Sequence, residues 1–93
     1  MRAIKYTSRF KRDYRREKSG ALGKKLDALL KEAIDVLAAD ALLPTRYVDH
    51  PLVGEWNDHR DCHIRPDLIL IYRKPDAESL ELVRLGSHSE LSL

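Results

Sequence analysis

The sequence predicts an α+β domain: a twisted, mainly antiparallel sheet with an N-terminal helical hairpin packed on one face. Three observations predict this class, because one short strand-like segment opens the chain, two helical segments follow, and three strand-like segments complete it. This segment order favours helices gathered on one face of a sheet. We expect residues 1–93 to form one domain around one core, and no apolar run approaches the roughly 20 residues that a membrane span needs.

The first strand and helix are expected within the first twenty residues. Weak alternation over residues 2–6 is typical of a short strand. Thr7 or Ser8 then supplies a helix N-cap, because a side-chain oxygen there can accept from a free amide of the first turn. The helix is expected to end near Ser19 and Gly20.

The second helix is the clearest element, because apolar residues repeat at steps of three and four between residues 22 and 39. Such spacing is typical of an amphipathic helix with one face toward the core. A short linker joins it to the first helix, which indicates an antiparallel hairpin. The apolar positions are Leu22, Leu26, Leu29, Leu30, Ala33, Ile34 and Leu37.

The second half of the chain is predicted to be a loop followed by three strands. Prolines and a glycine interrupt residues 39–54, which indicates a surface loop with a short extended piece at Tyr47 and Val48. Strands are expected over 55–64, with an interruption near 57–58, and over 68–74 and 79–85. After these, Gly86 is expected to free the tail and to permit a turn that presents His88.

Alternation along the first of these three strands sorts its side chains onto two faces. If the strand is regular, Cys62 and Ile64 point to the helices, whereas His59, Asp61 and His63 share the opposite, open face. An open face that holds imidazoles is a place where chemistry could occur, because histidine titrates near neutral pH.

Charge is unevenly distributed along the chain. Residues 1–31 carry eleven Lys or Arg against three acidic residues, and residues 32–93 carry six against twelve, so the halves have net charges of +8 and −6. A basic first helix is either a solvated face or a surface that binds phosphate by releasing counterions. The single cysteine, Cys62, fits a reducing compartment, so we expect a cytoplasmic protein.

Three chemistries are open to the histidines and the cysteine. Zinc could bind His59, Asp61 and His63, with His50 or His88 as a further ligand, but this spacing is weakly specific and no CxxC or HExxH motif supports it. We expect no metal and no cofactor. Cys62 is expected to be an inert core residue and no nucleophile.

The third chemistry is metal-free cleavage of RNA, in which the ribose 2′-hydroxyl is the internal nucleophile. The protein then supplies a base, an acid and cations that stabilise charge in the transition state. The side chains available for these roles are His50, His59, His63, His88, Asp67, Arg60 and Arg84.

One resemblance narrows the choice. The strings YVDHPLVGEWNDHRDCHIRPDLILIYR and LVRLGSHSEL closely resemble the YafQ branch of the RelE/ParE superfamily of bacterial toxins. The pattern of that branch is approximately Y-x-D-H-x-L-x-G-x-W, R-D-x-H-x-x-P-D, L-I-Y and R-x-G-[ST]-H. The resemblance implies a RelE/ParE-like fold and a type II toxin, an mRNA interferase that cleaves messenger RNA within the ribosome. Its implied partners are mRNA, the ribosome with its rRNA, and a cognate antitoxin.

The resemblance also implies roles for particular residues. Four match active-site positions, and the basic first helix would approach ribosomal RNA. Arg60 and Arg84 are weaker candidates for contact with the RNA phosphate, and His59 matches no role. The implied catalytic residues are His50, His63, Asp67 and His88, and the residues expected at the ribosome are Lys11, Arg12, Arg15 and Arg16.

Two positions depart from the family pattern. Leu68 stands where relatives commonly have Trp, and Ser92 stands where they often have Phe, so aromatic surface for base stacking is lost. A chain that lacks both aromatics could instead inhibit a protein target such as DNA gyrase, or retain antitoxin binding alone. The histidines argue against the first of these alternatives, and the second stays open.

Several other residues near the histidines are expected to be structural. Trp56 is expected to anchor the loop that bears His50, and Tyr72 to lie in the core. Asp49 and Asp61 are expected to orient the loop, Arg60 or a neighbouring histidine.

Overall fold

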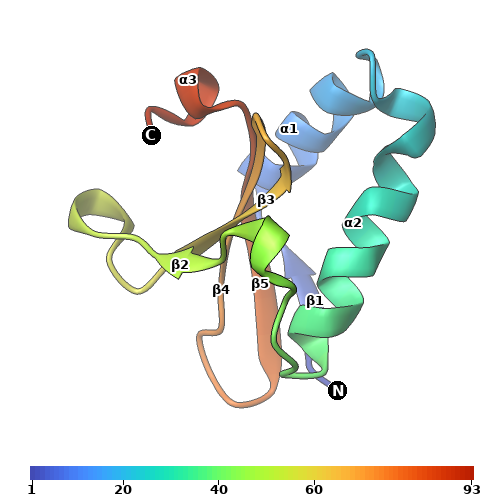
Figure 1. Cartoon of the computed structure of the whole chain (residues 1–93). Helices are drawn as coiled ribbons and strands as arrows, with labels where there is room; N and C mark the ends of the chain where they lie inside the picture. The colour runs from blue at the N-terminus through green and yellow to red at the C-terminus, as the bar shows by residue number, and fades with distance from the viewer.

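Five strands form one mixed sheet, and two long helices cover one of its faces in the computed structural model of residues 1–93 (Figure 1). The strand order is β1-β5-β4-β3-β2; β1 runs parallel to β5 and the other neighbours are antiparallel. This arrangement confirms the predicted fold class. The strands are β1 Ala3–Tyr6, β2 His50–Pro51, β3 Arg60–Arg65, β4 Leu68–Arg73 and β5 Ser79–Gly86.

The helical hairpin forms as expected, with α1 at Ser8–Lys18 and α2 at Gly23–Ala38. The Thr7 hydroxyl caps α1 by accepting from the amide of Phe10 at 3.0 Å. The linker between the helices is tight, because a Cβ at Gly23 would lie only 2.1 Å from the carbonyl oxygen of Lys18. A glycine there lets α2 begin directly against the end of α1.

The main core lies between the helices and the sheet. Cys62 and Ile64 of β3 point into it, which confirms the predicted facing of these two residues, whereas His59 precedes the strand. Tyr72 is also confirmed as a core residue. Helix α2 contributes its predicted stripe through Leu26, Leu30, Ala33 and Leu37.

The opposite face of the sheet is less open than expected, because a second, smaller apolar cluster covers part of it. Its buried members come from β4, β5 and the C-terminal tail, and Leu52 and Trp56 pack against them. Trp56 is therefore the packing residue that the sequence indicates. The buried members are Ile69, Ile71, Val83 and Leu91.

The tail is a short helix, α3 at His88–Leu91, which contradicts the expectation of a free tail (Figure 1). A capping box starts it: the Ser87 hydroxyl accepts from the Glu90 amide, and the Glu90 carboxylate accepts from the Ser87 amide. Gly86 has no positive φ, so the expected reason for this glycine is wrong. The packing around it is close, because a Cβ there would lie 3.1 Å from the Glu90 carboxylate and 3.0 Å from the Arg16 guanidinium, which would have to shift.

The loop before β3 also differs from expectation. Residues 54–56 form a 3-10 helix, η2 at Gly54–Trp56, and Asp58 has φ +70°, so β3 begins only at Arg60. The extended piece expected at Tyr47 is instead a 3-10 helix, η1 at Thr45–Tyr47. Val48 follows in the left-handed region at φ +49°, which turns the chain into β2.

A buried carboxylate binds α1 to β5. Asp13 is 2% exposed and accepts from the Arg84 guanidinium at 2.7 Å and from the Leu85 amide at 3.0 Å, while Arg16 lies 3.1 Å away. Burial opposes ionisation of Asp13, but these hydrogen bonds and the two positive charges outweigh it, so its pKa is lowered. The carboxylate therefore stays charged and fully paired at neutral pH.

None of the helices combines the length and the apolar character that crossing a membrane requires.

Asp13→Asn is expected to destabilise the fold by about 3 kcal/mol, because it leaves the Arg84 charge inside the structure without its counterion. Urea denaturation at pH 7 measures the loss. The matched control is Asp35→Asn, which breaks the exposed Lys31 pair and costs about 0.5 kcal/mol or less.

The same pair of proteins tests the charge of Asp13. Because folding lowers its pKa, its stabilising contribution is present above the unfolded value of 3.8 and is lost as the pH falls through the folded value. The gap between wild type and Asp13→Asn should therefore narrow below about pH 4. A gap that is constant down to pH 2, or equal losses in both variants at pH 7, would contradict this assignment.

Candidate active site

Strand register brings the candidate residues to one face and one end of the sheet. One lateral row across β2, β3, β4 and β5 is His50, Asp61, Ile71 and Arg84. The next row runs from His63 through Ile69 to Gly86. Because residues opposite each other in a sheet point to the same side, His50, Asp61 and His63 share the face away from the helices.

His88 and Asp67 meet at the end of this face. His88 begins α3 just beyond β5, and Asp67 lies in the turn between β3 and β4. The Asp67 carboxylate accepts from the backbone amide of His88 at 2.9 Å and lies 2.7 Å from Nδ1 of its ring. Hydrogen bonds from the amide and the ring, together with the charge of His88, lower the pKa of Asp67. Asp67 thus holds the His88 ring in one orientation.

Another histidine, His63, lies against His88 on this face of the sheet. Their ring centroids are 5.3 Å apart with an edge-to-face angle of 75°. His63 is half-buried at the end of β3, and no protein group holds either of its ring nitrogens by a hydrogen bond within the structure. The ring is therefore positioned by packing and presents polar atoms to a bound molecule.

His50 lies beside the buried carboxylate of Asp61. The sequence analysis expects Asp61 to orient a neighbouring residue and gives it no chemical role. His50 Nδ1 is 3.1 Å from Asp61 Oδ1 and donates to the Val48 carbonyl at 2.7 Å. Burial raises the pKa of Asp61, while the charges of His50, His63 and His88 oppose the rise. The charges of all three imidazoles therefore act on one carboxylate, and we call His50, His63, His88, Asp61 and Asp67 the histidine cluster.

The structure does not bring Arg60 to the histidine cluster. Arg60 precedes Asp61 in β3 and points to the other face, where its guanidinium lies 3.2 Å from the Asp49 carboxylate. Asp49 also accepts from the Tyr72 hydroxyl at 2.6 Å, so it orients its loop as expected. His59 likewise stays apart, with its ring against Trp56 and its Nδ1 on the Asn57 carbonyl.

Two other basic residues have structural partners. Arg84 lies on the face of the cluster, but Ile71 separates it from Asp61 and its charge is balanced by Asp13. Arg16 pairs with Asp13, Glu17 and Glu90, so it joins α1 to α3. The other three basic residues expected at the ribosome are exposed and form no ion pair: Lys11, Arg12 and Arg15.

Two clefts adjoin this face of the molecule. One, of about 520 Å³, is lined by His63 together with Arg65, Arg46 and Val48. The other, of about 450 Å³, lies on the far side of α3 and includes Trp56 and Ser92. Leu68, in contrast, is 3% exposed in the main core, so this position offers no surface on which a base could stack.

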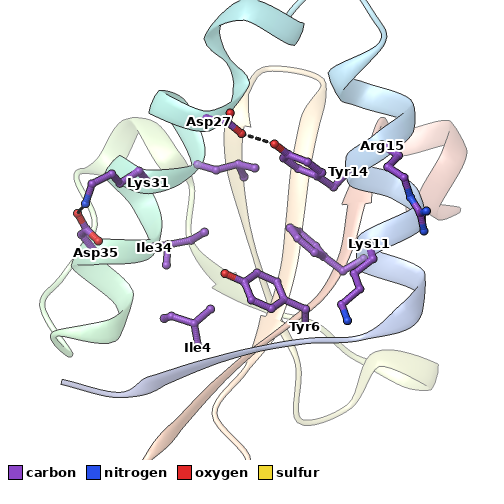
Figure 2. A pocket seen from close by; sticks show the side chains of 11 residues that line it. Ile4, Tyr6, Lys11, Tyr14, Arg15, Asp27, Lys31, Ile34 and Asp35 are labelled. Carbon is purple, nitrogen blue, oxygen red and sulfur yellow. Dashed lines mark hydrogen bonds and ion pairs between the residues drawn. The ribbon is translucent and has the colours of Figure 1, made fainter.

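The largest cavity lies on the helix side, away from the histidine cluster. It is a groove of about 740 Å³ between β1, α1 and α2 (Figure 2). Ile4 and Tyr6 of β1 face Ile34 of α2 across it, and Tyr6 is 52% exposed. Lys11 and Arg15 of α1 stand at its edge, so we call it the helix groove.

No three His, Cys, Asp or Glu side chains converge in an arrangement that could hold a metal ion. Cys62 is buried, and burial raises the pKa of its thiol well above its ordinary value. The chemistry that the cluster can perform is proton transfer between its imidazoles and a bound substrate, because a ring nitrogen can take up or give a proton.

Known proteins match the chain in both sequence and structure. Residues 2–93 match the family described as bacterial toxin of type II toxin-antitoxin system, YafQ. The mRNA interferase toxin YafQ of Escherichia coli strain B is 36% identical over 93 residues, covering 97% of this chain and 95% of that protein. A YafQ relative from Haemophilus influenzae is 45% identical over 64 residues, and that match spans 66% of this chain and 63% of the relative.

Solved structures agree over nearly the whole chain. A copper-bound mutant toxin from Helicobacter pylori superposes with a TM-score of 0.87 at 37% identity, covering 98% of this chain and 99% of that one. YafQ in the E. coli DinJ-YafQ complex has a TM-score of 0.78 at 32% identity, covering 98% of each chain. The chain therefore belongs to the YafQ family, the bacterial toxins of type II toxin-antitoxin systems.

The neutral His88 ring is expected to carry its proton on Nδ1, because that nitrogen faces a carboxylate that can only accept. Nitrogen-15 NMR of the ring identifies the tautomer. Asp67→Ala should remove this preference at His88 and leave His59, which lies against Trp56, unchanged. A wild-type ring protonated on Nε2, or one unaffected by Asp67→Ala, would contradict the contact.

Proposed function

We propose that the protein is a ribosome-dependent endoribonuclease that cleaves mRNA by metal-free acid-base catalysis. The observation that supports this most directly is that imidazoles from β2, β3 and α3 gather at one end of one sheet face, with His50 3.1 Å from Asp61 and the His63 and His88 rings 5.3 Å apart. Relatives named mRNA interferase toxin support the reaction class. An inhibitor that only binds a protein such as DNA gyrase has no need of clustered imidazoles.

The proposed reaction begins with the 2′-hydroxyl of the mRNA. His50 or His63 removes its proton, the 2′-oxygen attacks the neighbouring phosphorus, and the bond from phosphorus to the 5′-oxygen breaks. His88, held by Asp67, protonates the leaving 5′-oxygen. The products are a 2′,3′-cyclic phosphate and a 5′-hydroxyl, and each proton in these steps is carried by a side chain of the protein.

The two arginines expected from the sequence are poorly placed to stabilise the negative charge of the transition state. Arg60 points to the other face, and Arg84 is neutralised by Asp13. Arg65 has no ion partner and lines the same cleft as His63, so it is the better candidate for contact with the RNA phosphate.

Ribosomal RNA is the proposed partner of α1. Lys11, Arg12 and Arg15 are exposed and unpaired, so they can release counterions from phosphates, whereas Arg16 is occupied within the fold. Action on translating ribosomes also places the protein in the cytoplasm.

The cognate antitoxin is the proposed occupant of the helix groove. The groove is lined by apolar and aromatic side chains, and Lys11 and Arg15 at its edge favour an amphipathic segment that carries acidic residues. The DinJ-YafQ complexes show that relatives bind an antitoxin. A segment seated there also covers two of the residues proposed for the ribosome.

His63→Ala and His88→Ala are each expected to reduce mRNA cleavage by about 10²-fold or more, because each removes a group that transfers a proton. Cleavage in a reconstituted translation system measures the loss. His59→Ala is the matched control and should cleave like wild type, since His59 lies outside the cluster. Cleaved ends should carry a 2′,3′-cyclic phosphate, and a 2′-deoxy nucleotide at the cut should block the reaction.

Three results would contradict the proposal. The first, full cleavage by both variants, and the second, a product with a 3′-hydroxyl and a 5′-phosphate, would overturn the assignment of catalysis to the histidine cluster. The third is growth arrest by the wild type without any mRNA cleavage, which would favour inhibition of a protein target.

Tyr6→Asp is expected to weaken antitoxin binding at least tenfold, because it places a charge in the apolar helix groove. Titration calorimetry with the antitoxin encoded beside the toxin measures the affinity, and mRNA cleavage should persist. Val53→Asp, at an apolar side chain that is 85% exposed outside the groove, is the control. Equal effects of the two changes, or none from Tyr6→Asp, would place the antitoxin elsewhere.

A further inference from the structure

Asp61 combines deep burial with incomplete hydrogen bonding. The residue is 3% exposed, and no group in the structure donates a hydrogen bond to its Oδ1. A buried carboxylate without donors is costly for a fold, because it has lost water without a full replacement. Asp13, the other buried aspartate, is surrounded by donors, so the environment of Asp61 needs an explanation of its own.

The groups around Asp61 supply that explanation. His50 Nδ1 lies 3.1 Å from Oδ1, yet its proton points to the Val48 carbonyl at 2.7 Å. Asp61 therefore acts on His50 mainly through charge, while Val48 fixes the ring. The charges of His63 and His88 also favour the ionised form of Asp61, whereas the charge of Asp49 opposes it.

The orientation of His50 decides which of its atoms can react. Because Nδ1 donates to a carbonyl oxygen, which can only accept, the neutral ring carries its proton there and leaves Nε2 free as a base. When Nε2 accepts a proton, the ring becomes positively charged beside Asp61. The two charges then attract each other at close range, with the Asp61 side chain buried at 5% exposure and the His50 ring 46% exposed.

We propose that Asp61 is a positioning residue of the reaction, the buried counterion that stabilises the imidazolium formed on His50. The inference rests on the proposed nuclease function and specifies how one proton is held. The proton of the 2′-hydroxyl moves to His50 Nε2 as the 2′-oxygen bonds to phosphorus. The 5′-oxygen leaves with a proton from His88, so no proton is gained or lost by the site.

The first test separates catalysis from substrate binding. Asp61→Asn keeps the shape of the side chain and removes its charge, so kcat for mRNA cleavage should fall at least tenfold while KM changes less than twofold. In a His50→Gln background the same change should have little further effect, because the imidazolium that Asp61 stabilises can no longer form. The reconstituted translation system supplies both measurements.

The second test uses the free protein and needs no activity. Asp61→Asn removes an unpaired buried charge, so Tm at pH 7 should rise by roughly 4 to 8 °C. Since burial raises the pKa of Asp61, its charged form opposes folding at neutral pH, and the gain in Tm should shrink as the pH falls and Asp61 becomes protonated. Asp67→Asn, at an exposed carboxylate, should give no such rise.

Each outcome either supports or overturns the proposal. A lower Tm for Asp61→Asn would make Asp61 a structural ion pair, and an unchanged kcat would show that its charge is not used. A full loss that persists in the His50→Gln background would show that it acts through another histidine. If His63→Ala and His88→Ala keep full activity, the assignment of catalysis to the histidine cluster fails, whereas loss in those variants with normal kcat in Asp61→Asn removes the counterion role alone.

Discussion

The structure depends on the burial of β4 on both of its faces. Leu68, Leu70 and Tyr72 point into the main core, whereas Ile69 and Ile71 point into the smaller cluster under α3 and η2. A slip of one residue in the pairing of β4 would exchange these two sets, so the register is strongly specified. The same register places Asp61 opposite Ile71 and His63 opposite Ile69. The apolar packing of the central strand thus determines where the imidazoles stand.

The sequence predicts the parts of this structure that follow from periodicity. The helical hairpin, the order of elements, and the opposite facing of Cys62 and His63 all arise from local spacing, and each is present in the structure. The sequence also contains the capping box Ser87-x-x-Glu90, which is a signal for the start of α3. The proximity of His50, His63 and His88 is predicted only by the match to a family motif, because the spacing of residues does not indicate which distant segments meet in the fold.

Long-range pairing of charges is the part that the sequence could not supply. Arg84 and Arg60 both look like available cations, yet Asp13 from α1 binds the first and Asp49 binds the second. Asp13 is spaced like any polar residue of an amphipathic helix, and only the packing of α1 on β5 buries it. Asp61 is a similar case. The alternation of side chains along β3 predicts the face of the sheet on which Asp61 lies, but not that its Oδ1 has no hydrogen-bond donor. Such facts depend on the neighbours that the fold brings together.

Asp13 and Asp61 show how one small domain uses buried carboxylates in two ways. Around Asp13, two guanidinium groups and a backbone amide compensate for the lost water, its pKa is lowered, and the ion pair joins α1 to β5. Around Asp61, no group donates a hydrogen bond to Oδ1, the nearest charged partner is the imidazole of His50, and burial raises the pKa of the carboxylate. The first arrangement stabilises the fold in every step of a reaction. The second opposes folding until a proton arrives on a neighbouring ring, which is the behaviour that a proton-transfer site requires.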